Sequence, residues 1–526
     1  MWPIDMNNCK SRFGMKKNSW SAVVVGVLMA SCAGVGQSPT EAELSAFGTY
    51  VNALDTPQMQ QQIRKLLDSD TAHWQADKAV KARYAAIGCY EQSPLWFSRM
   101  GVIPEADSLL AFLRRELPQN GLDTTAFFIP QISSDLAIVH QLAFDSLGVS
   151  INEVLPRLDY QLSKAYVRYA LGQRYGFVSP GKLLNRLNYK PDGSDFARLF
   201  DYEIKAPDAD DALKALASDD RFSFLRDSRP DNYVYRVLQR HLSLATDRAE
   251  RRKLAVNMER CRWQIKHPGE HERRVLVNLP AQQLWAVGGE SVLDMRICFG
   301  AVPTKTPLLY SDISYMQVNP EWSIPFNIIK TEVAHRGGDS AYFARNRYSI
   351  IDRTSGDTLN AKTVTAERLR SGGVRVVQKS GVGNSLGRIV FRFPNNFSVY
   401  LHDTSNRGAF NRERRTLSHG CVRVQKPFDL ACFLLPGADE WMKDRLRISM
   451  DIEPVTDQGR EWLSSHADDP RPFKLLTYQD ISPKVPLYIV YFTAYPNPAT
   501  GVVEQWPDLY SYDSVISKAM GDLLLK

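Results

Sequence analysis

The chain has 526 residues, of which 44% are hydrophobic and 23% charged, and its formal net charge is +7. At about 100–200 residues per domain the length allows two to four domains, and the composition excludes the collagen-like and disordered classes. The positive excess favours acidic partners. We expect no nucleic-acid partner, because no zinc finger, RNP motif or basic helix accompanies that charge.

The first elements of the chain form an export signal, which we assign to residues 1–33. Lys16 and Lys17 precede an apolar run over residues 22–30, and small residues surround Cys32. This order is typical of a secretory signal peptide, and the run is too short to span a bilayer comfortably. Met29-Ala30-Ser31-Cys32 resembles a relaxed lipobox, which predicts lipidation of Cys32; ordinary signal cleavage is the alternative. We therefore expect an exported protein of the periplasm or cell envelope that a lipid attaches to the membrane.

The next part, residues 34–266, is predicted to be a mainly helical domain. Apolar residues recur every three to four positions, for example over 151–169 and 233–244, as they do on the buried face of a helix. Proline and glycine pairs such as Pro180-Gly181 separate the helical segments. The last of these segments is charged and ends near Pro268-Gly269, so we place the domain boundary after residue 266.

From residue 267 to residue 526 the apolar period falls to two, which predicts a mostly β domain. Strand-like runs cover residues 274–279 and 283–287, and C-terminal strands are expected over about 484–512. Only two helices are predicted here, at 327–335 and 427–435. The polar stretch from about 336 to 383 is too long for a plain connection and is predicted to be a lid or binding loop. The predicted fold class is therefore α+β.

One of the seven cysteines lies among residues that suit a nucleophile. Cysteine catalysis needs a base that takes the thiol proton and donors that hold the oxyanion. His402 ends a strand-like run 19 residues before Cys421, and an imidazole titrates near neutral pH. Gly420 permits a tight turn, so the backbone N–H groups of Gly420 and Cys421 are predicted to form an oxyanion hole.

Neighbouring polar residues complete the predicted site. Asp403 orients the His402 ring through its carboxylate or its carbonyl group, and His419 donates to the substrate or the oxyanion. Arg423 is predicted to lower the pKa of the thiol and to bind a carboxylate. Further arginines in the same stretch also suit an anionic substrate, namely Arg407, Arg412, Arg414 and Arg415.

Three other interpretations of these residues are open. A zinc site made of His402, His419 and Cys421 lacks an evident fourth ligand at motif spacing, and we expect no metal ion or other cofactor. A sortase-like transpeptidase also uses His, Cys and Arg in that order, although there the three usually lie far apart. An envelope lipoprotein with a structural role is the non-enzymatic alternative.

The residues Tyr400-Leu401-His402-Asp403-Thr404 and Ser418-His419-Gly420-Cys421-Val422-Arg423 together resemble the signature of the L,D-transpeptidases with a YkuD-type catalytic domain. Gly383 to Arg388 resembles the Asn-x-Leu-Gly stretch of that family. Asn319-Pro320-Glu321-Trp322 with Pro325 resembles a segment of the large YcbB-type members. The resemblance covers residues 260–510 well and residues 85–190 more loosely.

This resemblance implies a helical scaffold domain, a catalytic domain with a lid, and peptidoglycan stem peptides as donor and acceptor. Cys421 would expel D-Ala from a stem tetrapeptide and form a thioester, which an amine of a neighbouring stem resolves into a 3→3 cross-link. His402 would be the base and later the acid. A peptidoglycan-binding module of related proteins has no counterpart between residues 204 and 254, which leaves substrate grip to the lid and the helical domain. The oxyanion and substrate site would comprise Tyr400, Asp403, Ser418, His419, Gly420 and Arg423.

Overall fold

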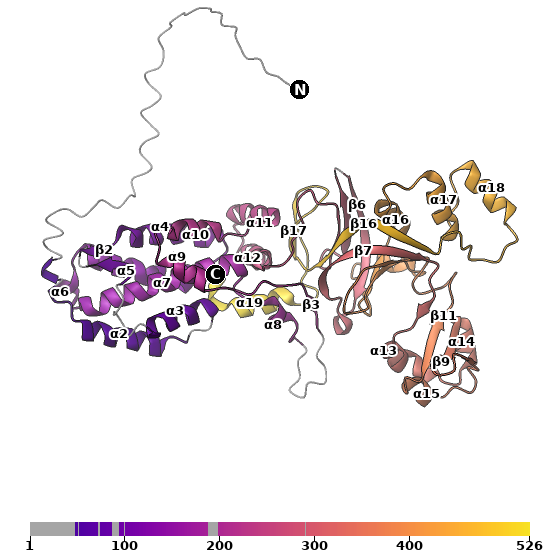
Figure 1. Ribbon diagram of the computed structural model, residues 1–526, viewed down its shortest axis with the longest axis horizontal. Helices are drawn as coiled ribbons and strands as arrows, with labels where there is room; N and C mark the ends of the chain where they lie inside the picture. The colour runs from indigo at the N-terminus through magenta and orange to yellow at the C-terminus, as the bar shows by residue number, and fades with distance from the viewer. Residues whose placement is uncertain are drawn as a thin grey trace, which may run out of the picture.

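A computed structural model describes residues 48–525, except 51, 72–73, 87–93, 99, 188–197 and 290. The predicted signal segment and Cys32 lie outside these residues. Figure 1 shows an elongated molecule with helices at one end, a large sheet in the middle, and two smaller units at the other end. This arrangement confirms the predicted α+β class. None of the described helices is long and apolar enough to cross a membrane.

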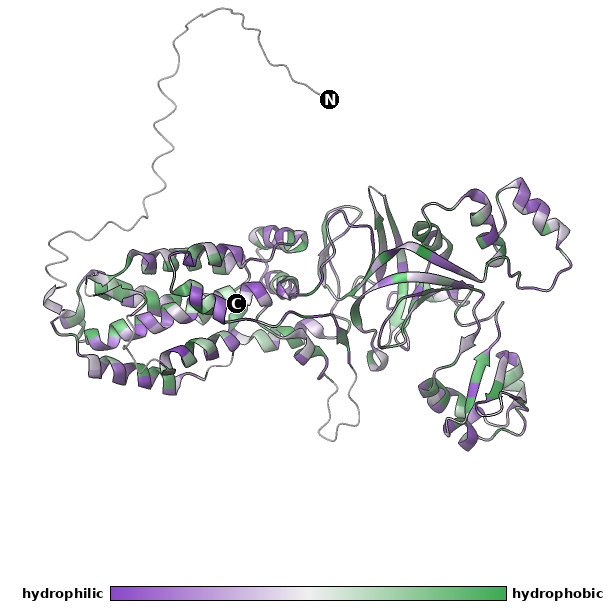
Figure 2. Cartoon of the chain, in the orientation of Figure 1, coloured by the Kyte–Doolittle hydropathy of each residue, from purple (hydrophilic) through white to green (hydrophobic). Residues whose placement is uncertain are grey.

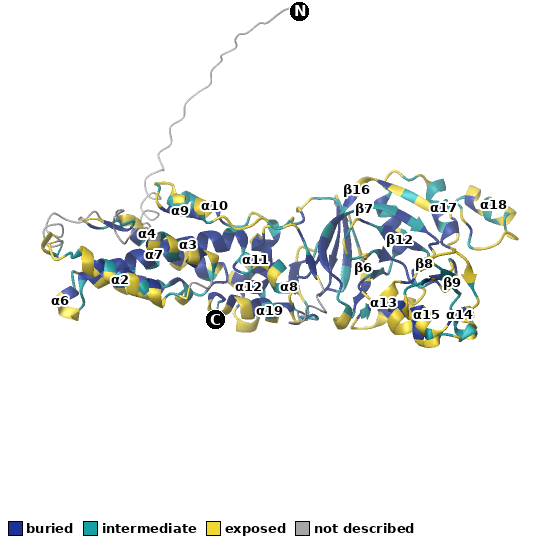
Figure 3. Cartoon of the chain, turned by 60° about the horizontal axis from the view of Figure 1, so that its bottom comes forward, coloured by how far each residue is buried: buried dark blue, intermediate teal, exposed yellow. Residues whose placement is uncertain are grey.

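The helical domain is built around helix α7 (Ile151–Tyr175), which begins at Ser150, whose hydroxyl accepts a hydrogen bond from the N–H of Asn152. Almost all of α7 is buried (Figure 3). Its neighbour α2 (Thr56–Ser69) buries one apolar stripe against it, as amphipathic helices do. The other helices of this part are α3 (Gln75–Ala86), α4 (Pro104–Gln119), α5 (Ile129–His140), α6 (Phe144–Leu147), α8 (Pro180–Leu184), α9 (Asp210–Leu216), α10 (Arg221–Asp227), α11 (Tyr233–Leu244) and α12 (Arg248–Arg262).

The central sheet closes on itself, because strand β12 pairs with both β7 and β13. The order β12-β13-β15-β6-β5-β4-β16-β7 runs from one side of this closure to the other, and β3 extends it beyond β7. The predicted strand runs lie in β4, β5 and β16. The strands are β3 (Phe200–Asp201), β4 (Arg274–Asn278), β5 (Gln283–Gly288), β6 (Ser291–Gly300), β7 (Leu308–Val318), β12 (Ile389–Arg392), β13 (Leu401–His402), β14 (Thr416–Ser418), β15 (Val422–Val424) and β16 (Tyr478–Val490).

The stretch predicted as a lid is a small folded unit, which we call the lid. Its sheet has the order β10-β9-β11-β8, and its apolar residues form a core separate from the main one. Figure 2 shows these apolar strands beside more hydrophilic helices. The unit includes residues from Trp322 onward, ahead of the polar stretch itself. Its elements are β8 (Trp322–Ser323), α13 (Phe326–Ile328), α14 (Ser340–Arg345), β9 (Tyr348–Asp352), β10 (Thr358–Leu359), α15 (Ala366–Arg370) and β11 (Val374–Gln378).

The prediction of only two helices after residue 267 is wrong. The second of them is confirmed as α16 (Pro427–Leu434), whereas the first begins as α13 and continues as a π-helix (Ile329–Val333) and a 3-10 turn. The missed helices are short and pack by tertiary contact, so their periodicity is weak. Besides α14 and α15 they are α17 (Glu440–Ser449), α18 (Asp457–Ser465) and α19 (Tyr512–Met520); the C-terminal hairpin is β17 (Ala494–Pro496) and β18 (Val503–Gln505).

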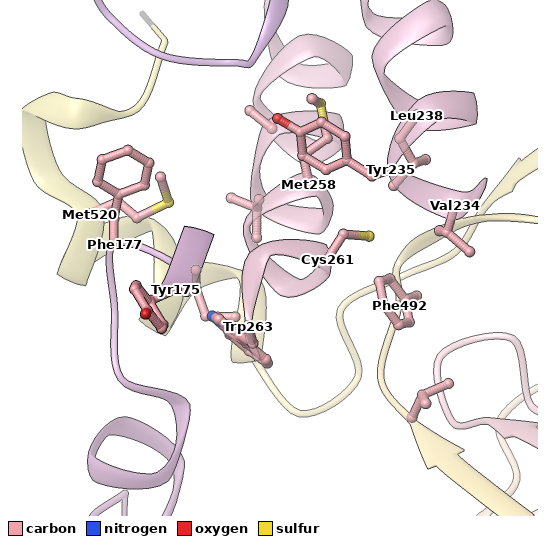
Figure 4. Close-up of a cluster of buried hydrophobic side chains, with 14 of the residues drawn as sticks. Tyr175, Phe177, Val234, Tyr235, Leu238, Met258, Cys261, Trp263, Phe492 and Met520 are labelled. Atoms are coloured by element: carbon pink, nitrogen blue, oxygen red, sulfur yellow. The ribbon is translucent and has the colours of Figure 1, made fainter. Parts of the chain in front are cut away.

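Helix α12 joins the helical domain to the sheet. Figure 4 shows Met258 and Cys261 of α12 within a buried cluster that also contains Tyr235 of α11 and Phe492 of the C-terminal chain. Polar contacts reinforce the cluster. The amide of Asn257 bonds both the N–H and the hydroxyl of Thr493, at 3.0 and 2.8 Å.

We expect the substitution Asn257→Ala to lower the free energy of unfolding by about 2–4 kcal/mol. It leaves the buried Thr493 N–H and a guanidinium N–H of Arg260 without their acceptor, and each such loss costs about 1–3 kcal/mol. Urea unfolding is the measurement. Arg248→Ala, at the exposed start of the same helix, is the matched control, and equal stability of the two variants would contradict this account.

Candidate active site

The central sheet brings the predicted catalytic residues to one face. Strands β13 and β15 are parallel neighbours in which Leu401 pairs with Val422 and His402 with Arg423. The Val422 N–H donates to the carbonyl of Tyr400 at 3.1 Å. Because side chains alternate along a strand, Tyr400 and His402 share a face with Cys421 and Arg423. Two segments of the chain thus place the side chains of His402 and Cys421 on the same face of the sheet.

The His402 ring is buried, and its orientation is set by the backbone. Its Nδ1 lies 2.5 Å from the carbonyl oxygen of Asp403. A carbonyl can only accept, so Nδ1 carries the proton and Nε2 is the unprotonated nitrogen of the neutral ring. Burial, together with the positive charge of Arg423, lowers the pKa of His402 to about 3. The imidazole is therefore neutral at physiological pH and able to accept a proton.

The Cys421 thiol is protonated at rest. Burial raises its pKa, although Tyr400, Arg392 and Arg423 act in the opposite direction. The sequence-based prediction that Arg423 lowers the thiol pKa is confirmed, although desolvation outweighs this effect and the net shift is upward. The Cys421 Sγ lies 4.0 Å from the carbonyl oxygen of Ser398. The pair therefore starts as a thiol and a neutral imidazole.

The turn before Cys421 is held by Ser418 and needs a glycine. The Ser418 hydroxyl donates to the Cys421 carbonyl at 2.5 Å and accepts from the Gly420 N–H at 3.1 Å. Gly420 has φ +120°, which favours glycine. Since its N–H is engaged by Ser418, the Cys421 N–H is the group of the predicted oxyanion hole that the described hydrogen bonds leave available.

His419 points away from the thiol toward the lid. Its Nε2 donates to a carboxylate oxygen of Glu332 at 2.5 Å, and both side chains are about half exposed. Glu332 lies in the π-helix of the lid, and single π-turns inside helices are frequent at functional sites. His419 thus connects the lid to the catalytic turn.

The Asp403 carboxylate holds neighbouring parts of the chain in place. One carboxylate oxygen accepts the N–H of Arg388 at 2.8 Å, and the other pairs with Arg407. The side chain packs so closely on Gly387 that a Cβ there would lie 2.4 Å from it. Of the two orientations predicted for His402, the structure thus shows the one through the carbonyl group of Asp403.

Two of the arginines predicted to bind an anionic substrate make contacts within the protein instead. Arg415 is buried and donates to the carbonyl groups of Ile297 and Gln282, and Arg407 pairs with Asp403. Arg423 is the predicted arginine that acts on both His402 and Cys421. Sequence spacing does not distinguish an arginine that hydrogen-bonds the backbone of a loop from one that faces a substrate.

Several residues of the site lie outside the motif. Arg392 stacks 4.4 Å over the Tyr400 ring and favours the thiolate. The Trp322 indole approaches the Tyr400 hydroxyl, and its N–H is buried without a hydrogen-bond partner in the described part of the chain. Beneath the turn, Thr306 donates to the Gly420 carbonyl at 2.8 Å. Only the Asn-Pro-Glu-Trp segment carried a sequence signal for any of these.

The described residues contain no group of three or more His, Cys, Asp or Glu side chains that could hold a metal ion. The ligand set considered from sequence was His402, His419 and Cys421. Two of these residues have other partners in the structure: His402 bonds a backbone carbonyl group, and His419 bonds Glu332.

Alkylation of Cys421 should be slow at neutral pH and should rise with pH beyond 9, because the thiolate is the reactive form and burial raises the thiol pKa. Iodoacetamide labelling over a pH series, followed by peptide mass spectrometry at Cys421, is the measurement. Arg423→Gln should slow the labelling further, since it removes a charge that favours the thiolate. A labelling rate that is constant from pH 6 upward would instead reveal a preformed thiolate.

The substitution Glu332→Gln should loosen the lid, because it weakens a charge-assisted hydrogen bond between the lid and the catalytic turn. Hydrogen exchange over residues 322–378 should become faster, with little change in the main sheet. Lys330→Gln, an exposed position on the same π-helix, is the control for loss of a charge. Equal exchange in the two variants would show that the contact does not hold the lid.

Comparisons with known proteins agree with this geometry. Residues 272–448 match the YkuD family, described as the L,D-transpeptidase catalytic domain, and residues 78–242 match a family described as the scaffold domain. A protein of Haemophilus influenzae named "Putative L,D-transpeptidase" is 28% identical over 327 residues. That alignment covers 60% of this chain and 61% of the relative's length.

The match to the catalytic family includes every motif residue described above, from Tyr400 to Arg423, and the match to the scaffold family falls on the helices around α7. Residues 272–448 are therefore similar to the L,D-transpeptidase catalytic domain of the YkuD family, and residues 78–242 to the scaffold domain.

Proposed function

We propose that the protein is a peptidoglycan L,D-transpeptidase that forms 3→3 cross-links through a thioester on Cys421. The observation that carries this proposal is the shared face of β13 and β15, on which the side chains of His402 and Cys421 both lie. The catalytic-domain match and the named relative support the same chemistry.

In the first step a stem tetrapeptide binds with its last peptide bond at the thiol. His402 Nε2 takes the proton of the Cys421 thiol while the sulfur attacks the carbonyl carbon of the penultimate residue. The Cys421 N–H holds the oxyanion that forms. The C–N bond then breaks, the imidazolium returns its proton to the leaving amine, and D-Ala departs from the thioester.

In the second step an amine of a neighbouring stem peptide attacks the thioester carbonyl. His402 accepts a proton from this amine, the C–S bond breaks, and the sulfur recovers the proton. The products are a new amide bond and the free thiol. The neutral resting state of His402 suits both steps, because the ring must accept a proton before it can return it.

The charge at the site suits the anionic stem peptide. Arg423 and Arg392 both act on the thiol, and the Arg423 Nε is buried without a hydrogen-bond partner in the described part of the chain. A guanidinium binds a carboxylate in a fixed fork geometry. A substrate carboxylate is therefore the expected partner of Arg423.

The proposed place of action is the cell envelope. Residues 1–33 carry the features of an export signal with Cys32 as the lipidation site, and peptidoglycan lies outside the cytoplasmic membrane. A periplasmic enzyme with a lipid anchor at Cys32 is the arrangement we propose.

Purified protein incubated with disaccharide tetrapeptide should release D-Ala and form cross-linked dimers. Cys421→Ala should abolish both products, and His402→Gln should slow them about 100- to 10,000-fold, as loss of a general base does. His241→Gln, a surface histidine of α11, is the control.

The same assay separates the alternatives. A sortase-like transpeptidase or a structural lipoprotein would release no D-Ala, and either result would overturn the proposal. Stoichiometric zinc in the purified protein would favour the metal-site interpretation instead.

A further inference from the structure

A groove separates the base of the lid from the segment that follows α18, on the side of the molecule where α18 and the lid lie (Figure 1). We call it the basal groove. Its volume is about 780 Å³, within the range of about 300–1,000 Å³ typical of ligand sites. Glu321, Arg347 and Lys379 line the lid side, and Trp462, Arg471 and Lys474 line the other side.

The walls of the basal groove are fixed by buried amides. The Asn319 side chain donates to the carbonyl of Phe473 at 3.1 Å, which ties the two walls together. The Asn384 side chain donates to the carbonyl groups of Pro320 and Lys379, at 3.2 and 3.0 Å. Both asparagines are buried. The groove is therefore preformed, and its exposed charges stand on a rigid backbone.

The groove carries an excess of positive charge. Four of its lining residues are cationic and two, Glu321 and Asp469, are acidic. Arg347 is engaged by backbone carbonyl groups, among them that of Ser380 at 2.5 Å. Lys379 and Lys474 are exposed and form no ion pair within the described residues. Two exposed lysines thus line the same preformed groove.

Aromatic rings lie beside these charges. The Trp462 indole stacks on the His466 ring at 4.1 Å, and its edge meets the ring of Phe473, over which Arg471 stacks at 4.8 Å. Apolar surface with a few charged groups is the composition of a site for a polar peptide. Glu321 precedes Trp322, whose indole approaches the Tyr400 hydroxyl of the catalytic face. A residue that lines the groove and a residue that approaches the catalytic face are therefore consecutive in the chain.

From these observations we propose that the basal groove binds the carboxylate-bearing stem peptide of a peptidoglycan strand, with Lys379 and Lys474 as the groups that contact its carboxylates. This inference rests on the proposed function, because it concerns the substrate of the same site. Two strands offer this chemistry, the donor and the acceptor. The groove would contact one of them at a second place besides the thiol, and the sequence between residues 204 and 254 shows no peptidoglycan-binding module that could do so.

The test is the double charge reversal Lys379→Glu/Lys474→Glu in the full chain. A tetrapeptide titration measures the KM of the donor through D-Ala release. A tripeptide titration at saturating donor measures the KM of the acceptor through dimer formation, since a tripeptide has no D-Ala to lose. We expect one of the two KM values to rise about five- to tenfold with kcat unchanged, and added salt to reduce this difference.

The control is Lys214→Glu/Lys518→Glu, which makes the same change of net charge at exposed positions of α9 and α19. A rise of the donor KM alone assigns the groove to the donor, and a rise of the acceptor KM alone assigns it to the acceptor. Unchanged KM values, or a fall in kcat alone, would overturn the proposal.

Binding of the tetrapeptide to Cys421→Ala protein separates this inference from the proposed function. If the wild-type protein is inactive while charge reversal still weakens this binding, the proposed reaction fails and the groove stands. If the wild-type protein is active and charge reversal changes neither KM nor binding, the reaction stands and the groove fails.

Discussion

Charged and amide side chains buried along α12 hold the helical domain against the sheet. Glu259 and Arg262 are fully buried, and Glu259 accepts the N–H groups of Phe177 and Val178. Removing one partner from such a network leaves a buried charge uncompensated, so the helix has one acceptable position. Asn257, which bonds Thr493, transmits that position to the C-terminal chain. There the Tyr510 hydroxyl donates to the Gly300 carbonyl at 2.5 Å, next to the loop that supports the Gly420 turn.

The same principle of burial sets the electrostatics of the catalytic face. Desolvation disfavours the charged form of each group, so it lowers the pKa of His402 and raises that of Cys421. Base and nucleophile are both kept neutral at rest. The positive charge beside them, from Arg423 and Arg392, then serves the substrate and the developing anion more than the resting thiol.

The lid and the catalytic turn are coupled by few contacts. Because the lid has its own apolar core, it keeps its internal structure whatever its position on the sheet. Its described links to the catalytic face are the Glu332 contact with His419 and the approach of Trp322 to Tyr400. Its base also forms one wall of the basal groove. The lid therefore contributes residues both to the catalytic face and to the basal groove.

The α+β class, the order of helical and β parts, and the presence of a histidine and a cysteine in one motif could be predicted from the sequence. These features are local, since periodicity and short spacing reflect the geometry of single strands and turns. Three features could not be predicted in this way. Ser418 accepts the Gly420 N–H, and the polar stretch folds as an α/β unit. Arg415 donates to backbone carbonyl groups, whereas Arg392 acts on the thiol. Each of these depends on contacts between distant segments and on desolvation, which spacing along the chain does not encode.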